Sequence, residues 1–207
     1  MKLYLFGGAE LQLGHGPRLK ELIKETILGL NPKTIVHVPF ARLNPTEEDF
    51  REGWFKELMK DSHIPILDAR SKNDLKKAVD PVIFINGGHG RYDLINMINA
   101  DPRLLQMIMN AKCIVAESSG AKVLAEYQSG ARGENKIIEG IGVLKNTIIE
   151  PHYTERGSQR LLAQEMKKSK MKYGIGIDCI TGIVIDTEEF PDKWEKIGDG
   201  TVDVKVT

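Results

Sequence analysis

The residues best placed to do chemistry lie in the segment Ala116-Glu117-Ser118-Ser119-Gly120-Ala121. A short apolar run precedes this segment, and a helix-like run follows it. A serine flanked by small residues between a strand and a helix is the pattern of a nucleophile elbow. Such a turn presents the hydroxyl at a helix N-terminus, where free N–H groups favour developing negative charge. The register of the small residues Ala116 and Gly120 selects Ser118 as the nucleophile, rather than Ser119.

A serine hydroxyl is a weak nucleophile and needs a general base, which one of the five histidines could supply. His152 is the strongest candidate, because it follows the apolar run Thr147–Glu150 and precedes a helical segment. Its ordinary pKa near ~6.5 suits a base that works around neutrality. His37 lies inside a predicted strand and is expected in the core, and His63 is expected in solvent. His15 lies on a glycine-flanked loop and has a weaker claim to a role in the site.

The glycine-rich loop Gly87-Gly88-His89 ends another predicted strand and could supply part of an oxyanion hole. One donor is expected from the N–H of Ser119, the residue after the nucleophile, and another from this loop. A tight turn or a phosphate-binding loop would also explain these glycines. However, the loop lacks the Gly-Lys-Ser/Thr ending of a P-loop and the G-x-G-x-x-G spacing of dinucleotide sites.

A carboxylate should orient the histidine, and the sequence leaves several candidates open. Glu134, Glu139 and Glu150 lie between the serine and the histidine, and Glu126 lies just after the elbow. Glu117 lies beside the nucleophile and could line the pocket or point away. No H-E-x-x-H motif, close cysteine pair or carboxylate cluster is present in the sequence, so we expect no metal and no cofactor. Helix capping explains Glu155, three residues after His152, as well as metal binding does.

The elements that must position these residues alternate between strand and helix. Four of the predicted strands are followed by Gly7-Gly8, Phe40-Ala41, Gly87–Gly90 and Ser118. Alternating βαβ units predict a mostly parallel sheet with helices on both faces, in three layers. The carboxyl ends of parallel strands meet at one sheet edge, where ligands bind. The candidate site residues therefore fall at the edge where a site is expected.

The predicted strands are Lys2–Phe6, Thr34–Val38, Ile64–Leu67, Pro81–Asn86 and Cys113–Ala116. The predicted helices are Arg18–Leu28, 44–60, Asn73–Val79, Arg103–Met109, a helix after Ser118, and 159–168.

The last third of the chain predicts short strands and C-terminal β-hairpins. Gly174–Cys179 and Gly182–Asp186 are expected to form one hairpin. Trp194–Ile197 and Thr201–Val206 are expected to form another, because they flank Asp199-Gly200. Lys136–Ile138 and Gly142–Leu144 are further β-like runs. No long linker or repeat interrupts the sequence, so residues 1–207 are expected to form a single domain.

Composition excludes several classes of protein. The 207 residues include 29 basic and 29 acidic side chains, so nothing favours binding to nucleic acid or to an anionic membrane surface. No apolar run approaches the ~20 residues of a transmembrane helix, and the N-terminus does not resemble a signal peptide. Cys113 and Cys179 each lie in an apolar run, which predicts reduced thiols and a cytoplasmic protein. A homodimer is compatible with these features.

In the order of its motifs the chain resembles peptidase family S51, the group of dipeptidase E and cyanophycinase. That family has a fold related to class I glutamine amidotransferase domains. Its pattern is a Gly-Gly loop, a small-x-Ser-x-Gly elbow, a Pro-His-aromatic segment and a helix with an Arg-Leu pair. Here these segments are Gly87-Gly88-His89, Ala116–Ala121, Pro151-His152-Tyr153-Thr154 and Arg160-Leu161, followed by Gly174–Asp178.

The resemblance implies Ser118 as nucleophile, His152 as base and an acid after the elbow, for which Glu134 is nearest in spacing. It also implies Gly88 and Ser119 as oxyanion donors, with Gly87 and His89 in the same loop. The chain departs from the family pattern in three places. Ala116 stands for the usual glycine, Ser119 for alanine, and His89-Gly90 for Asn-Thr.

The resemblance and the residues together predict a serine peptidase that acts on a small peptide or dipeptide through an acyl-enzyme. Two alternatives remain open. One is an amidase or esterase on the same scaffold, and the other is a non-catalytic binding module that retains the fold. The changes at Ala116 and His89 motivate the second alternative. The altered glycine loop also means that the dipeptidase E preference for an N-terminal aspartate does not transfer to this chain.

Overall fold

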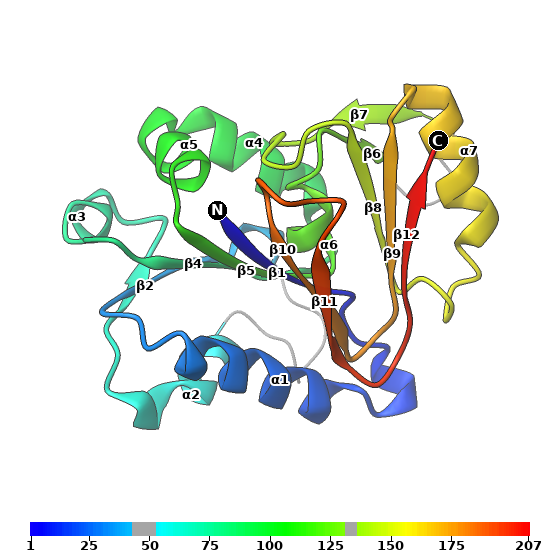
Figure 1. Cartoon of the computed structure of the whole chain (residues 1–207). Coiled ribbons are helices and arrows are strands. Elements are labelled where there is room, and N and C mark those ends of the chain that lie inside the picture. Colours follow the sequence, from blue (N-terminus) through cyan, green and yellow to red (C-terminus); the bar gives the residue numbers. More distant parts are fainter. Residues whose placement is uncertain (43–52, 131–135) are drawn as a thin grey trace.

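A computed structural model describes residues 1–42, 53–130 and 136–207 (Figure 1). Within these ranges a central sheet has the strand order β11-β10-β1-β5-β4-β2-β3. The strands β1, β5, β4, β2 and β3 pair in parallel, whereas β10 and β11 add an antiparallel margin beside β1. The bounds are β1 (Lys2–Phe6), β2 (Ile35–Val38), β3 (Ile66–Asp68), β4 (Val82–Ile85), β5 (Cys113–Glu117), β10 (Thr181–Asp186) and β11 (Trp194–Gly198).

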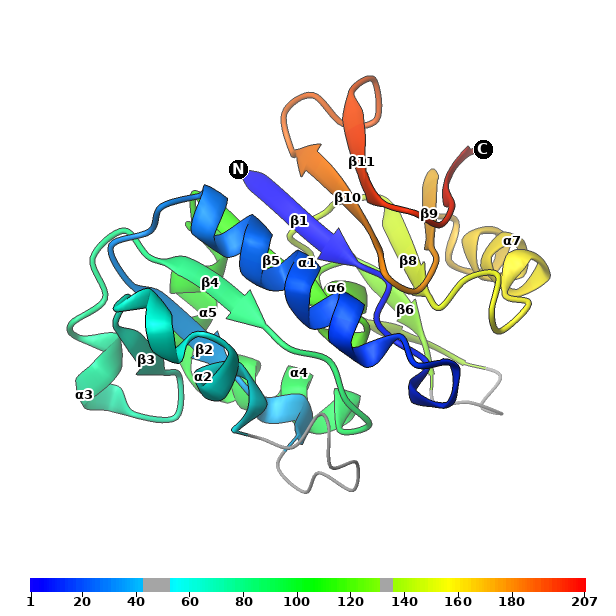
Figure 2. The ribbon, with the colours of Figure 1, turned by 90° about the horizontal axis from the view of Figure 1, so that it is seen from below.

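Helices cover both faces of this sheet, as the sequence predicts (Figures 1 and 2). Helices α1 and α2 lie on one face, and α4, α5 and α6 lie on the other. Alternate side chains of each strand point to opposite faces, so Phe84 packs with the α1 layer and Ile83 with the α4–α5 layer. The helix bounds are α1 (Gly16–Gly29), α2 (Trp54–Leu58), α3 (Lys72–Leu75), α4 (Arg91–Ala100), α5 (Pro102–Met109), α6 (Ser119–Lys122), and the 3₁₀ turns η1 (Leu11–Leu13), η2 (Phe40–Arg42) and η4 (Lys60–Ser62). The mostly parallel three-layer α/β fold is therefore confirmed.

A smaller sheet stands beside the central one and has the order β12-β9-β8. Strands β8 (Thr147–Pro151) and β9 (Tyr173–Ile177) are parallel, and β12 (Val202–Val206) runs antiparallel to β9. Helix α7 (Gln159–Ser169) packs against it through Leu162 and Met166, at the right of Figure 1. A short antiparallel pair, β6 (Tyr127–Ser129) and β7 (Ile137–Glu139), lies nearby. The β-like run at 142–144 makes only an isolated bridge from Leu144 to Ala125.

Both predicted C-terminal hairpins are wrong in their pairing. Strand β9 does not pair with β10, and β11 does not pair with β12. Instead β9–β10 and β11–β12 run side by side as one long antiparallel ribbon that bends between the two sheets. The bend is held where Asp178 accepts hydrogen bonds from the backbone N–H groups of Thr154 (2.9 Å) and Thr201 (2.8 Å). The Asp199-Gly200 signal marks this bend, and the chain reverses at residues 187–193.

The predictions for the helices are confirmed only in part. The helix after the elbow is confirmed but has only four residues, because the chain turns into β6. Helix α4 was not predicted from the sequence. Of the helix expected over 44–60, residues 43–52 lie outside the described residues, and Trp54–Leu58 is helical.

Two expectations about cysteine and histidine environments are confirmed. Cys113 and Cys179 are both free thiols. His37 is buried, whereas His63 is exposed. In the described part of the chain, no helix combines the length and apolarity needed to cross a bilayer.

Candidate active site

Ser118 lies at the sharp turn between β5 and α6, as the elbow pattern predicts. Its backbone has φ 52° and ψ −119°, a conformation that is uncommon for a residue with a side chain. The turn is held by a hydrogen bond from the Ser118 N–H to the carbonyl oxygen of Phe6 (2.8 Å) on the neighbouring strand β1. Gly120 is needed because a Cβ there would overlap the carbonyl oxygen of Ile85. The small residues around the serine therefore serve the close approach of strand and helix.

His152 meets the serine from the adjoining sheet. Nε2 of His152 lies 2.9 Å from Oγ of Ser118, within hydrogen-bond distance. The imidazole follows the end of β8, and its backbone N–H donates to the carbonyl oxygen of Gly7 (3.1 Å) at the end of β1. His152 is buried, and its φ is 52°. The structure therefore brings together the two residues that the sequence selected as nucleophile and base.

The other ring nitrogen of His152 faces two further groups. Nδ1 lies 3.0 Å from Oε1 of Glu10 and 3.1 Å from Sγ of Cys179. Glu10 also accepts a hydrogen bond of 2.6 Å from Nε of Arg156. Burial would raise the pKa of the Glu10 carboxyl, but hydrogen bonds from Arg156 and Gln12 outweigh it and lower that pKa. Glu10 is therefore an ionised carboxylate beside the histidine at neutral pH.

The electrostatics of the site keep the imidazole neutral. Burial lowers the pKa of His152 to about 4, and the positive charge of Arg156 acts in the same direction. The carboxylate of Glu10 opposes them and raises this pKa. Burial also raises the pKa of the Cys179 thiol above its usual range. At neutral pH the histidine is thus unprotonated and able to accept a proton.

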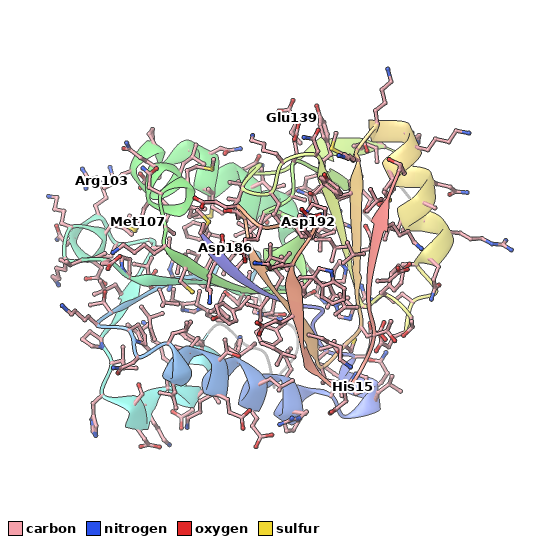
Figure 3. All side chains as sticks on the ribbon, viewed as in Figure 1. His15, Arg103, Met107, Glu139, Asp186 and Asp192 are labelled. Carbon is pink, nitrogen blue, oxygen red and sulfur yellow. The ribbon has the colours of Figure 1, made fainter. Side chains whose placement is uncertain are left out.

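The acids that the sequence left open between the serine and the histidine have other partners or are exposed, except for one that the structure does not describe. Glu134 lies in 131–135, outside the described residues. Oε2 of Glu126 accepts the N–H of Asn146 (2.7 Å), and Glu150 pairs with Lys122. Glu139 is exposed on β7, at the top of Figure 3. Sequence reasoning missed Glu10, and its one available signal was its place four residues beyond the end of β1.

The glycine loop after β4 lies against the elbow. The N–H of Gly88 donates to Oγ of Ser119 (2.9 Å), and the Ser119 hydroxyl donates to the carbonyl oxygen of Gly88 (2.7 Å). Ser119 is the first residue of α6, so its own N–H has no acceptor within the helix. A Cβ at Gly88 would overlap the carbonyl oxygen of Ala41, which explains the glycine there. His89 is exposed at the mouth of the site.

Glu117 joins the elbow to this loop. Its carboxylate is 1% exposed and accepts a hydrogen bond from the N–H of Gly87 (2.5 Å). Nη2 of Arg42 lies 3.6 Å from Oε1 of Glu117. Burial raises the pKa of Glu117, while Arg42 and the Gly87 N–H act against that rise. Glu117 holds the loop from a buried position and also borders a hollow beside Ser118, so the expectation that it could line the pocket is confirmed.

Two hollows meet at the nucleophile. One of about 360 Å³ is lined by Arg91, Tyr92, Lys122, Ser129 and Leu161, among others. The second, of about 280 Å³, is lined by residues that include Glu10, Gln12, Arg42 and His152. Gly88, His89, Ser118 and Arg156 border both hollows. A bound molecule could therefore extend to either side of the serine hydroxyl.

A buried charged group forms one wall of the larger hollow. Nζ of Lys122 contacts Oε1 of Glu150 and Oγ of Ser129 (2.5 Å). Glu165, on α7, lies beside them and is 4% exposed. Burial and the neighbouring charge of Glu150 raise the pKa of Glu165 to about 8, although Lys122 lowers it. At neutral pH this acid is therefore mainly protonated.

Two groups of potential metal ligands share the Cys179 thiol. In one group Glu10, His152 and Cys179 have ligand atoms within 4.8 Å of one another, and in the other His15, Glu155 and Cys179 do. The interpretation of Glu155 as a helix cap is wrong. Helix α7 begins only at Gln159, and Oε1 of Glu155 accepts the N–H of Cys179 (3.0 Å).

Comparisons with known proteins agree with the fold. No protein-family model matches the chain. It is 26% identical to a protein named cyanophycinase from Geminocystis herdmanii, over 232 aligned residues covering 99% of this chain and 82% of that one. It superposes on the crystal structure of a peptidase from an acI-B1 Actinobacterium with a TM-score of 0.65 and 22% identity, covering 97% and 88% of the two chains. A Listeria monocytogenes protein with the provisional name peptidase E gives a TM-score of 0.59 at 16% identity, covering 100% and 98%.

Proposed function

We propose that the chain, an S51-like peptidase, cleaves small peptides by a serine mechanism. The observation that carries the proposal is the 2.9 Å contact between Oγ of Ser118 and Nε2 of His152, made on a strained elbow. Strain of this kind persists only where the surrounding structure enforces it, and it is typical of functional sites. The relative and the two solved structures support the peptidase activity and the fold, respectively.

In this mechanism Ser118 attacks the carbonyl carbon of the substrate while His152 takes the hydroxyl proton at Nε2. The resulting imidazolium gives that proton to the leaving amine, and an acyl-enzyme forms on Ser118. Water, deprotonated by His152 in turn, then releases the acid product. The low pKa of His152 supports its role as base, because the imidazole is neutral before the attack.

Glu10 acts as a positioning residue for the histidine. Its carboxylate lies 3.0 Å from Nδ1 and would stabilise the positive charge that His152 acquires during the attack. Arg156 keeps this carboxylate ionised and fixed. Glu134 remains the alternative from sequence spacing, and matched variants of the two acids distinguish them.

The oxyanion would be held by the N–H groups of Ser119 and Gly88. The N–H of Ser119 has no intrahelical acceptor. The N–H of Gly88 is hydrogen-bonded to the Ser119 hydroxyl, so this hydroxyl must turn away before Gly88 can contribute. The substitution of serine for the alanine of the family pattern thus adds a competitor for one oxyanion donor.

The hollows favour a short substrate. The volume of about 360 Å³ is near the lower end of the range for ligand pockets, ~300 to ~1,000 Å³, and the volume of about 280 Å³ is just below it. One hollow would take the acyl side of the scissile bond and the other the amine side. A dipeptide or another short peptide fits this division better than an extended chain does.

The test is hydrolysis of a panel of dipeptides, amides and esters by wild type, Ser118→Ala and His63→Asn. His63 is exposed and has φ 56°, which asparagine tolerates, so that variant controls for an unrelated histidine change. We expect Ser118→Ala to lose activity and His63→Asn to keep it. Activity that survives in Ser118→Ala would refute the serine mechanism. Activity on esters alone would show that the enzyme is an esterase and not a peptidase. Labelling of Ser118 by a phosphonate, lost in His152→Ala, would establish the role of the base.

A further inference from the structure

The back of His152, away from Ser118, is a cluster of three different ligand atoms. Nδ1 lies 3.1 Å from the thiol sulfur of Cys179 and 3.0 Å from the carboxylate oxygen Oε1 of Glu10. All three ligand atoms fall within 4.8 Å of one another. Cys179 and His152 are buried, at 1% and 4% exposure, and the Glu10 side chain is 14% exposed. A serine mechanism requires the carboxylate but has no need of the thiol.

Three separate parts of the fold build this cluster. Glu10 follows β1, His152 follows β8, and Cys179 lies at the bend of the β9–β10 ribbon. The bend is fixed by Asp178 and by the hydrogen bond from the Cys179 N–H to Glu155. The backbone that carries the thiol is therefore fixed beside His152.

The chemistry and the spacing of these atoms suit zinc. Zn²⁺ prefers tetrahedral sets of thiolate, imidazole and carboxylate ligands at about 2.0–2.3 Å, which puts neighbouring ligand atoms roughly 3.3–3.8 Å apart. The two measured separations fall a few tenths of an ångström short of that spacing, so a small opening of the cluster would admit the ion. Calcium and magnesium prefer sets of oxygen ligands and would not select this thiol.

Cys179 also belongs to a second, competing group of potential ligands, which the test must distinguish from the first. Nδ1 of His15 is buried and has no hydrogen-bond partner within the described structure. His15 lies just before α1, at the lower edge of Figure 3, and belongs with Glu155 to the other ligand group of Cys179. Buried polar atoms are usually paired, so the unpaired nitrogen of His15 makes this second group a real competitor for the ion.

We propose that Zn²⁺ binds Cys179, Nδ1 of His152 and Glu10, and that the bound ion switches the enzyme off; the second part rests on the proposed serine mechanism. On binding, the S–H bond of Cys179 breaks, the Zn–S bond forms, and the thiol proton passes to solvent. The imidazole keeps one proton, which moves from Nδ1 to Nε2. Nε2 then cannot accept the proton of Ser118, and Glu10 no longer supports an imidazolium.

The binding part is tested with Co²⁺, whose bond to a thiolate gives a charge-transfer absorption in the near ultraviolet. The full chain is first treated with a chelator and then titrated with Co²⁺, and Zn²⁺ is used to displace it. We expect the absorption in wild type and in Ser118→Ala. We expect it to disappear in Cys179→Ser and to weaken by roughly 10–100-fold in affinity in His152→Ala. Cys113→Ser is the matched control and should keep it, since Cys113 begins β5 at the end opposite Ser118.

The variants also decide which side of the thiol holds the ion. Absorption that survives in His152→Ala but disappears in His15→Ala would place the metal with His15 and Glu155 and overturn the proposal. Absence of any cobalt–thiolate band in wild type would also overturn it.

The inhibitory part is measured as peptidase activity against free Zn²⁺. We expect wild type and Cys113→Ser to lose activity, and Cys179→Ser to need at least about ten-fold more zinc. Full activity in wild type with bound zinc would overturn this part. If no peptide is cleaved at all, the serine mechanism fails, while the cobalt titration of Ser118→Ala still tests the site by itself.

Discussion

The backbone of Gly8 faces His152 so closely that a Cβ on Gly8 would lie 2.8 Å from Nε2 of the imidazole. The same Cβ would lie 2.8 Å from Cβ of Ser118. Gly8 has φ +95°, so the close approach and the backbone conformation both require glycine. The loop after β1 thus forms one wall of the contact between nucleophile and base.

Gly8→Ala should therefore separate Ser118 from His152. A displacement on the order of 1 Å costs about 10²-fold in rate, so we expect kcat/KM to fall by about that factor. Gly14→Ala is the matched control, because Gly14 also has positive φ (+70°), but a Cβ added there would meet no atom within 4 Å. It should cost about 1 kcal/mol of stability from backbone strain while kcat/KM stays near wild type. Equal loss of activity in both variants would show that strain alone, and not the contact, explains the effect.

The sequence predicted the part of the site that depends on local pattern. Ser118 is marked by the small residues around it, and His152 by its place after a strand, so both were found without the fold. Glu10 and Cys179 were missed because their local sequence gives little sign of a role, the place of Glu10 four residues beyond the end of β1 being the one signal for it. They become neighbours of His152 only because β1 lies beside β5 and the β9–β10 ribbon bends between the two sheets.

The local nature of sequence patterns also explains the wrong prediction of strand pairing. Parallel strands and their covering helices followed from alternating periodicity, which is a local property. The pairing of the last four strands was wrong because Asp199-Gly200 suits a ribbon bend as well as a hairpin turn. Which of the two forms depends on the strands available for pairing in each sheet, and that information is not local.

The Glu10 carboxylate should matter more to the reaction than Glu134 does. Glu10→Gln keeps the size of the side chain but removes the charge that supports the imidazolium of His152. We expect kcat to fall by roughly 10²–10⁴-fold with a smaller change in KM. Glu134→Gln should leave kcat within about three-fold of wild type. The reverse ranking in steady-state kinetics would move the role to Glu134.

The pH profile should report the low pKa of His152. The base must be neutral, so kcat/KM should stay level as pH falls from 8 to about 5 and decline only as His152 becomes protonated near pH 4. Arg156→Met removes a positive charge that lowers this pKa, so the acid limb should move to higher pH. Arg103→Met, which removes a charge on the distant helix α5, should not move the limb (Figure 3). An acid limb near 6.5 in wild type would contradict the buried, neutral imidazole.

The Glu117 carboxylate should hold the glycine loop through its acceptor atom more than through its charge. Glu117→Gln retains an oxygen that can accept the Gly87 N–H, whereas Glu117→Leu leaves that buried N–H unpaired. We expect Leu to lower the free energy of unfolding by about 1–3 kcal/mol and to lower kcat, with a smaller effect for Gln. Denaturant unfolding together with kcat checks both effects. Equal losses in Gln and Leu would assign the role to the ion pair with Arg42 instead.

The Glu165 carboxyl should make the fold less stable as pH rises. Its pKa is about 8 in the folded protein against an ordinary 4.5, so between these values the native state holds a proton that the unfolded chain has lost. Stability then falls with pH across this window, by up to about 1.4 kcal/mol per pH unit. Glu165→Gln keeps the neutral shape and should flatten the decline, melting higher than wild type at pH 8 but near it at pH 5. Glu188→Gln is the control, since Glu188 is an exposed acid of the same kind in the turn before β11. A wild-type melting temperature that is equally high at pH 5 and pH 8, with no gain from Glu165→Gln, would mean that Glu165 is ionised beside Lys122 throughout.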